Sequence, residues 1–270
     1  MFLVNNEGEI KMRIPIYQID AFTNEQFKGN PAAVCPLEEW IKDDLMQKIA
    51  AENNLSETAF FVKNGDEYEL RWFTPKGEID LCGHATLATA YVIFTYLDKS
   101  IMNIKFNTKS GILEVSKEGG LLAMIFPSRE GEKCNIPESL IKGLGKRPKE
   151  VYKSRDYMAV FETEQDIINL ELNMDELKKL DGFGVIVTAK GNEVDFVSRA
   201  FGPKAGIDED PVTGSAHCTL VPYWKNVLGK NEFVALQLSE RGGKLFCTDL
   251  GEMVKISGEV ASYLEGYINV

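Results

Sequence analysis

Two stretches of the chain, residues 83–96 and 214–224, carry no charged side chain. A surface helix has an apolar stripe with charges opposite it, whereas a helix that is apolar all round is buried. Each stretch therefore predicts a central buried helix. Pro222 is expected to end or kink the second helix near its last turns.

Most of the remaining pattern is typical of strands. Short β-rich runs, several of them alternating, predict strands over 14–20, 59–62, 112–115, 122–126, 158–161, 183–187 and 254–256. Surface helices are expected over 37–53 and 174–180, the first because Leu45, Ile49 and Ala50 recur at helical spacing. The pattern indicates an α+β fold in which sheets wrap around buried helices.

A short pattern before the first buried stretch returns before the second. Residues 74–80 read TPKGEID and lead to Gly83, and residues 202–208 read GPKAGID and lead to Gly214, 131 residues later in a chain of 270. Such a repeat predicts two pseudo-symmetric lobes, each a curved, mostly antiparallel sheet around a buried helix. We expect an N-terminal lobe over 1–127 and a C-terminal lobe over 128–270, whose last strand is able to return to the first lobe. Chance similarity of so short a pattern is the alternative.

The charge balance and the cysteines narrow the classes of protein. The chain has 41 acidic and 30 basic residues, so no broad basic field exists for nucleic acid. The longest uncharged run, 81–97, is too short and polar for a confident membrane span, and the N-terminus does not read as a signal peptide. Five dispersed cysteines predict reduced thiols in a cytoplasmic protein. With no C-x-x-C and two histidines, no zinc site is expected.

The two buried helices begin at Gly83-His84 and at Gly214-Ser215. Unpaired backbone N–H groups and the helix dipole make such starts suited to anions. If the lobes face each other, both starts point into one cleft, where they would hold a carboxylate or a developing oxyanion. The alternative is that each glycine only permits a tight turn.

Three side chains are candidates for acid–base chemistry. Glu57 precedes an apolar strand, where a carboxylate is costly unless it is paired or used, although a solvated turn carboxylate is the alternative. His84 stands at a helix start, where burial and the dipole would disfavour its charged form. Asp210 ends an acidic run before the second helix, where acids are also routine caps. His217 lies one turn further and is expected to be a hydrogen-bonded core histidine.

Five ordered blocks carry a resemblance to a known family: IYQIDAFT at 16–23, GNPAAV at 29–34, NLSETAF at 54–60, LCGHAT at 81–86 and EDPVTGSAH at 209–217. In these blocks the chain resembles the PhzF family, the phenazine-biosynthesis isomerase-like proteins of the diaminopimelate-epimerase-like superfamily. Residues 1–11 look like an extension, because the family starts near the residue matching Met12.

The resemblance implies a cofactor-independent isomerase without a metal, active as a homodimer on a small unsaturated amino or hydroxy carboxylic acid. By the same resemblance Glu57 is the acid/base, in the cleft between the lobes. The rest of the implied site consists of His84 and Asp210, which act in catalysis, and Gly83, Gly214 and Ser215, which bind substrate. The best-known reaction of the family, isomerisation of a dihydro-hydroxyanthranilate, does not fix the substrate of this chain.

Two other functions compete with the isomerase. The true epimerases of the superfamily use two facing thiols, and here Cys82 stands beside the first helix start while the second offers Asp210 and Ser215 but no cysteine. Cys218 is expected to face the core, and Cys82 to be a small buried apolar residue. A third hypothesis is a binding protein that has retained the substrate cleft but does not catalyse a reaction.

Overall fold

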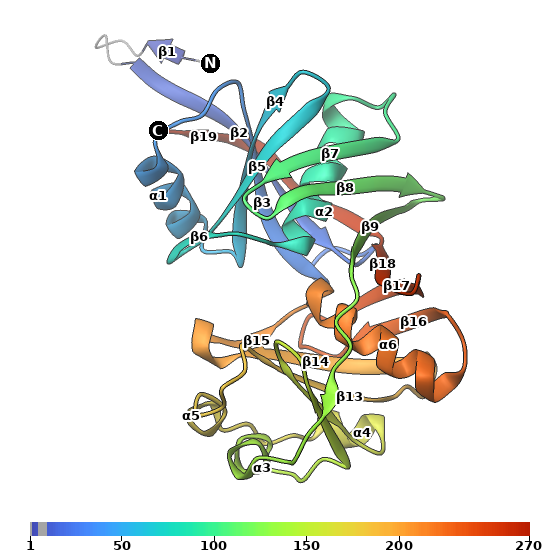
Figure 1. The fold of residues 1–270 in the computed structure, drawn as a ribbon. Helices are drawn as coiled ribbons and strands as arrows, with labels where there is room; N and C mark the ends of the chain where they lie inside the picture. Colours follow the sequence, from blue (N-terminus) through green and yellow to red (C-terminus); the bar gives the residue numbers. More distant parts are fainter. Residues whose placement is uncertain (1, 5–9) are drawn as a thin grey trace. The chain divides into compact units, whose positions relative to one another are not determined.

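The computed structural model describes residues 2–4 and 10–270, and the chain divides into two compact units (Figure 1). Unit 1 extends to Met124 and also includes Glu259–Val270, and unit 2 covers Ile125–Gly258. Of the predicted extension 1–11, residues 1 and 5–9 lie outside the described part. Its strand β1 (Phe2–Val4) pairs with β2.

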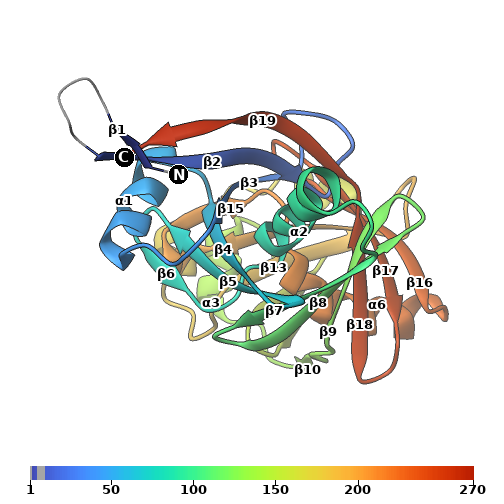
Figure 2. The ribbon, with the colours of Figure 1, turned by 90° about the horizontal axis from the view of Figure 1, so that it is seen from above.

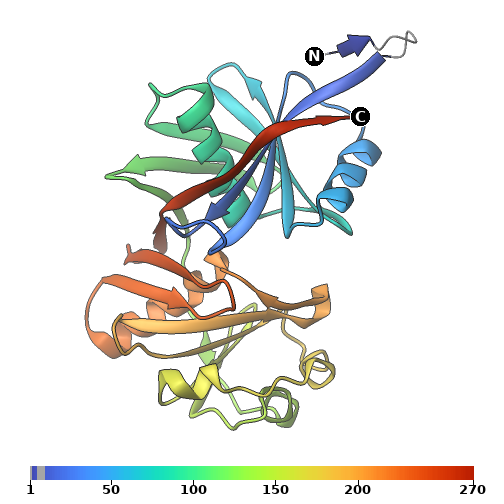
Figure 3. The same cartoon turned by 180° about the vertical axis from the view of Figure 1, so that it is seen from behind.

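The sheet of unit 1 has the strand order β19-β2-β3-β4-β5-β7-β8-β9. Within it β3–β4 and β5–β7 are parallel and the other pairs are antiparallel, while the short β6 pairs with β5. The C-terminal strand lies along β2, seen as red beside blue in Figures 2 and 3. The strands are β2 (Ile10–Ala21), β3 (Asn30–Leu37), β4 (Glu57–Asn64), β5 (Glu67–Thr74), β6 (Gly77–Ile79), β7 (Asn103–Thr108), β8 (Gly111–Glu118), β9 (Leu121–Pro127) and β19 (Val260–Asn269).

The sheet of unit 2 repeats this topology. Its order is β10-β11-β12-β13-β14-β16-β17-β18, with β12–β13 and β14–β16 parallel and the short β15 on β14. The matched pattern of parallel and antiparallel pairs confirms the repeat and the predicted fold class. The strands are β10 (Glu132–Lys133), β11 (Glu150–Lys153), β12 (Tyr157–Val160), β13 (Val185–Lys190), β14 (Phe196–Gly202), β15 (Ile207–Asp210), β16 (Glu232–Gln237), β17 (Gly243–Asp249) and β18 (Met253–Gly258).

Each unit has one helix buried along most of its length, as the uncharged stretches predict. In unit 1, α2 (Gly83–Val92) packs on β2, β3 and β4 and continues as a π-helical turn, Ile93–Leu97. In unit 2, a 3-10 turn (Gly214–Ala216) leads into α6 (His217–Leu228). The buried threonines of α2 are satisfied locally, since Thr86 and Thr89 each donate to the carbonyl four residues earlier.

The sequence predicts that Pro222 ends or kinks α6. The helix does not end there, since it continues to Leu228. Proline lacks the N–H that would bond to the carbonyl four residues back, here that of Cys218. The backbone N–H of Arg129 donates to this carbonyl instead, at 2.9 Å. A neighbouring segment therefore satisfies the group that proline leaves without a donor.

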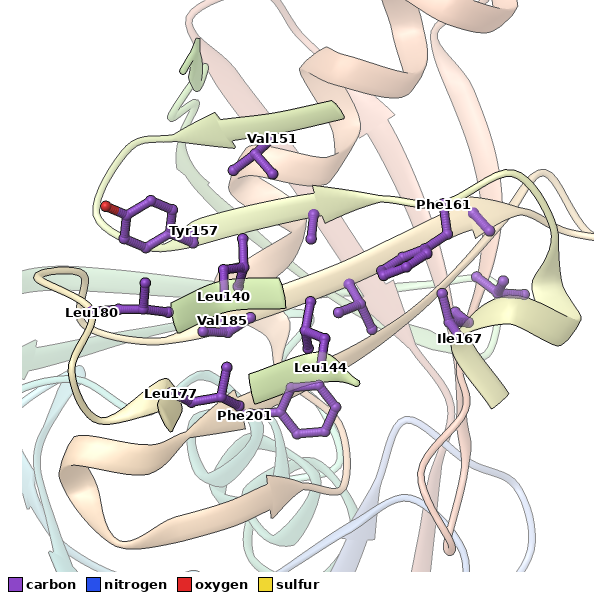
Figure 4. Packing of buried hydrophobic residues seen from close by; sticks show 14 residues of the cluster. Leu140, Leu144, Val151, Tyr157, Phe161, Ile167, Leu177, Leu180, Val185 and Phe201 are labelled. Atoms are coloured by element: carbon purple, nitrogen blue, oxygen red, sulfur yellow. The ribbon is translucent and has the colours of Figure 1, made fainter. Parts of the chain in front are cut away.

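Smaller helices cover the opposite face of each sheet. In unit 1, α1 (Asp43–Asn53) buries Met46, Ile49 and Ala50 and lies across the sheet from α2 (Figure 3). In unit 2, α3 (Glu138–Leu144), α4 (Glu164–Ile168) and α5 (Met174–Leu177) enclose an apolar cluster (Figure 4).

Three predicted boundaries are corrected. The helix expected over 37–53 begins at Asp43 because β3 extends to Leu37. The helix expected over 174–180 ends at Leu177. The strand expected over 183–187 begins at Val185 because residues 181–183 form bends. No helix in the described residues is long and apolar enough to cross a bilayer.

Candidate active site

The segment before β4 turns the carboxyl group of Glu57 into unit 1. Helix α1 ends at Asn53, and Asn54 adopts the left-handed conformation (φ 49°) with its N–H bonded to the carbonyl of Ala50. Asparagine is among the residues that tolerate this conformation best. Strand β4 then begins at Glu57, opposite Ala32 of β3, and the glutamate is only 8% exposed. The Asn-Leu-Ser-Glu stretch is thus a helix end followed by a strand start.

The first turn of α2 brings two more polar side chains to this carboxyl group. Nε2 of His84 lies 2.9 Å from Oε2 of Glu57, and Sγ of Cys82 lies 3.5 Å from Nδ1 of His84. All three residues are buried. This contact between Oε2 of Glu57 and the ring nitrogen lies within ion-pair distance. Gly83 opens the helix beside them.

The charge of His84 differs from the sequence-based expectation. Burial disfavours the imidazolium, but Cys82 and Glu57 favour it together, and the pKa of His84 is raised well above its usual value. Burial raises the pKa of the Cys82 thiol to about 11, so the thiol is uncharged at neutral pH. The expectation considered burial and the helix dipole alone. It is wrong because β4 supplies a carboxylate.

This ion pair predicts a pH-dependent contribution to stability. A base whose pKa is raised in the folded state stabilises the fold below its unfolded pKa, about 6.5 for histidine, and this contribution is lost as the pH rises through the folded value. The difference in unfolding free energy between wild type and His84→Gln should therefore shrink at alkaline pH. Urea unfolding across this pH range measures it, and a constant difference would contradict the ion pair.

In unit 2 the predicted residues gather at the end of β15 and the start of α6. Asp210 is half-buried, and its Oδ2 accepts a hydrogen bond of 2.5 Å from the hydroxyl of Thr213. Gly214 and Ser215 form the 3-10 turn that follows. The hydroxyl of Ser215 accepts a hydrogen bond from Arg155 at 3.3 Å. The structure therefore collects Asp210, Gly214 and Ser215 in unit 2, and Glu57, Gly83 and His84 in unit 1.

Gln237 supports this turn and was missed by the sequence argument. It is fully buried at the end of β16, where its amide donates to the carbonyl of Asp210 and the hydroxyl of Thr213 and accepts from the N–H of Thr213. A signal for it exists in the sequence. Strand alternation places Gln237 on the buried face with Phe233 and Ala235, and a polar residue there needs partners.

Replacing Gln237 with leucine is expected to destabilise the protein by about 2 kcal/mol. The substitution leaves the half-buried N–H of Thr213 without its acceptor and removes both hydrogen bonds donated by the buried amide, and an unsatisfied buried group costs roughly 1–3 kcal/mol. Chemical denaturation of the two proteins measures the difference. Gln165→Leu, at an exposed position of α4, is the matched control and should change stability little. Equal stability of wild type and Gln237→Leu would contradict the prediction.

The repeat also identifies the residue of unit 2 that is equivalent to Cys82. Cys82 precedes Gly83 in unit 1, and Thr213 precedes Gly214 in unit 2, so no thiol stands at the second position. Cys218 is buried as expected, and burial raises its pKa to about 11. Cys82 is buried too, yet it contacts His84 instead of serving only as an apolar filler. Donor atoms of Cys82, His84 and Glu57 all lie within 4.8 Å of one another, close enough to share a cation.

Two topologically matched units, each with a buried helix opening at a glycine, together with the buried Glu57–His84 pair, define an epimerase-like fold carrying acid–base groups. The sequence profile of the family described as "Phenazine biosynthesis-like protein" matches residues 19–266. The chain belongs to this PhzF family and is an isomerase of the family.

Known proteins agree with this assignment. An uncharacterized isomerase of Pseudomonas aeruginosa is 50% identical over 259 residues, covering 96% of this chain and 100% of the relative. The crystal structure of a PhzF family protein from Enterococcus faecalis superimposes with a TM-score of 0.94 at 47% identity, covering 96% and 100% of the two chains. A predicted epimerase from Pseudomonas aeruginosa, at a TM-score of 0.72 and 19% identity over 94% and 99%, shares the fold.

Proposed function

We propose that this protein isomerises a small unsaturated amino or hydroxy carboxylic acid by proton transfer through Glu57, without an organic cofactor. The observation that carries the proposal is the buried carboxyl group of Glu57, whose Oε2 lies 2.9 Å from Nε2 of His84 at the start of α2. A buried carboxylate with a charged partner in a helix N-terminal turn is typical of acid–base sites.

In the proposed reaction, a C–H bond next to an unsaturated system breaks and its proton passes to a carboxylate oxygen of Glu57. The electron pair delocalises into the unsaturated system. The same oxygen then returns the proton to another carbon of that system, so the double bond moves and the atoms balance. The imidazolium of His84 and the N-terminal N–H groups of α2 favour the negative charge that develops.

The unit 2 residues are proposed to bind substrate. Asp210 would hold the amine or hydroxyl group, and the turn containing Gly214 and Ser215 would hold the carboxylate. The guanidinium of Arg155 donates to the hydroxyl of Ser215 and is ion-paired with the buried carboxylate of Asp156, which anchors it beside this turn. We further expect the enzyme to act as a homodimer in the cytoplasm.

The observations do not favour the racemase hypothesis. A two-thiol racemase needs a second cysteine, and Thr213 occupies the position that matches Cys82. The racemase hypothesis still makes a distinct prediction, since a two-base racemase that uses a thiol loses its activity in Cys82→Ala. A binding protein without turnover would gain thermal stability from small amino carboxylic acids and leave them unchanged.

Proton NMR in D₂O tests the proposed function. A dihydro-hydroxyanthranilate and a small set of unsaturated amino and hydroxy acids are incubated with the wild-type protein. Movement of the double bond supports the proposal, whether the accepting carbon carries solvent deuterium or the transferred proton. Deuterium at a stereocentre without movement of a double bond would favour the racemase. Binding by thermal shift with neither isomerisation nor exchange across the set would contradict the isomerase.

A further inference from the structure

The cluster of Glu57, Cys82 and His84 combines three kinds of donor atom. These are a carboxylate oxygen, a thiol sulfur and an imidazole nitrogen, the ligand types of zinc sites in proteins. Cys82 and His84 are two residues apart in one turn, which limits how far their donors move relative to each other. The residues are 8%, 6% and 7% exposed respectively, so the site is largely shielded while each residue keeps some access.

The distances fit one ion after small side-chain rotations. Tetrahedral zinc with the usual bond lengths separates nitrogen and oxygen ligands by about 3.4 Å, and nitrogen and sulfur by about 3.6 Å. In the structure Nε2 of His84 lies 2.9 Å from Oε2 of Glu57 and 4.0 Å from Sγ of Cys82. These two pairs each need an adjustment of about half an ångström, and Sγ of Cys82 lies within 4.8 Å of a carboxylate oxygen of Glu57, so changes of side-chain torsions are able to bring the three donors onto one ion.

We propose that Glu57, Cys82 and His84 form a zinc-binding site whose occupation inhibits the enzyme. Three protein ligands leave a fourth position for water or a substrate carboxylate. Binding displaces the thiol proton and any imidazolium proton to solvent. A bound ion occupies the carboxylate that takes the substrate proton, so inhibition rests on the proposed function, whereas zinc binding itself does not.

Cobalt(II) is the probe for the site, because cobalt bound to a thiolate absorbs in the near ultraviolet and zinc displaces it. Wild-type protein dialysed against a chelator is titrated with cobalt under reducing, oxygen-free conditions. We expect a charge-transfer band that saturates near one equivalent and disappears when zinc is added. The isosteric variant Cys82→Ser should lose the band. Glu57→Gln should keep a thiolate band but bind more weakly.

Zinc affinity, measured by competition with a chromophoric chelator, should fall more than ~100-fold in Cys82→Ser, since loss of even an outer-shell partner costs 10–100-fold. Cys134→Ser is the matched control, because Cys134 is a half-buried thiol in unit 2 and should leave cobalt and zinc binding unchanged. Equal zinc affinity in wild type and Cys82→Ser, or no thiolate band in wild type, would overturn the site. Circular dichroism shows whether each variant folds.

Zinc should also suppress isomerisation by wild type, and a chelator should restore it. Because cobalt binding is measured without substrate, the site and the reaction are tested separately. If the band behaves as expected and no substrate turns over, the metal site stands and the proposed function fails. If turnover occurs and zinc leaves it unchanged, the inhibitory role fails.

Discussion

Glu57→Gln is expected to lower the rate of substrate isomerisation and of deuterium incorporation by roughly 10²–10⁴-fold, the usual contribution of a positioned acid–base group. Glutamine has nearly the same size and keeps an oxygen beside His84, but its amide does not accept a proton at neutral pH. Proton NMR in D₂O, with wild type and variant at equal concentration, measures both rates. Binding of the substrate should weaken much less than its turnover.

The matched control for this prediction is Glu52→Gln. Glu52 lies five residues earlier, near the end of α1, and is exposed. Loss of its charge should leave both rates within a factor of about two, because exposed substitutions away from a site have small effects. Full deuterium exchange in a folded Glu57→Gln protein would assign the proton transfer to another group.

The parts of the fold that follow from local pattern could be predicted from the sequence. Residues 83–96 and 214–224 lack charges, and both form helices that are buried for most of their length. The repeat around Gly83 and Gly214 anticipates the matched topology of the two sheets. In each case the information lies within a short window, because a buried helix and its preceding turn are set by neighbouring residues.

Features that depend on contacts with distant segments could not be predicted from local sequence patterns. Pro222 ends no helix because Arg129, far away in sequence, bonds to the freed carbonyl. The pKa of His84 is raised by Cys82 and by Glu57, and β4 brings Glu57 next to it from outside the helix. Local rules predict a helix that ends or kinks at Pro222, and a neutral His84. The helix does not end there, and the charges around His84 reverse the second expectation.

In the candidate site, too, the sequence motifs predict some residues, while others depend on contacts that only the structure shows. The motif residues were identified from five ordered blocks, yet Gln237 lies outside all of them and bonds to Asp210 and Thr213. The role of Cys82 depends on the direction of its side chain toward His84, which no spacing in the sequence reveals. Motifs therefore located the acids and the turns, whereas their supporting contacts required the structure.

His217 should make the protein acid-sensitive, and His217→Gln should remove much of that sensitivity. The histidine is fully buried, its Nδ1 lies 3.0 Å from the carbonyl of Thr213, and its Nε2 has no partner. The expectation of a hydrogen-bonded core histidine is thus confirmed. Burial lowers its pKa to about 4, although the bond to Thr213 acts in the opposite direction.

The direction in which pH changes the stability follows from comparing the pKa of His217 in the folded and unfolded states. An unfolded histidine takes up a proton near pH 6.5, while His217 resists protonation until about pH 4. The neutral buried form therefore stabilises the fold fully above about pH 6.5, and this contribution is lost as the pH falls toward 4. At about 1.4 kcal/mol per pKa unit, the loss amounts to ~3 kcal/mol.

Denaturant unfolding at about pH 7 and about pH 4.5, in wild type and His217→Gln, measures this difference. The glutamine amide can donate to the carbonyl of Thr213, so the variant keeps a hydrogen bond while it loses the titrating ring. His84→Gln is the internal comparison, because the raised pKa of His84 shifts stability in the opposite direction with pH. NMR of the imidazole protons assigns the effect, since the chain has two histidines. A His217 resonance that titrates near pH 6.5 would contradict the buried neutral form.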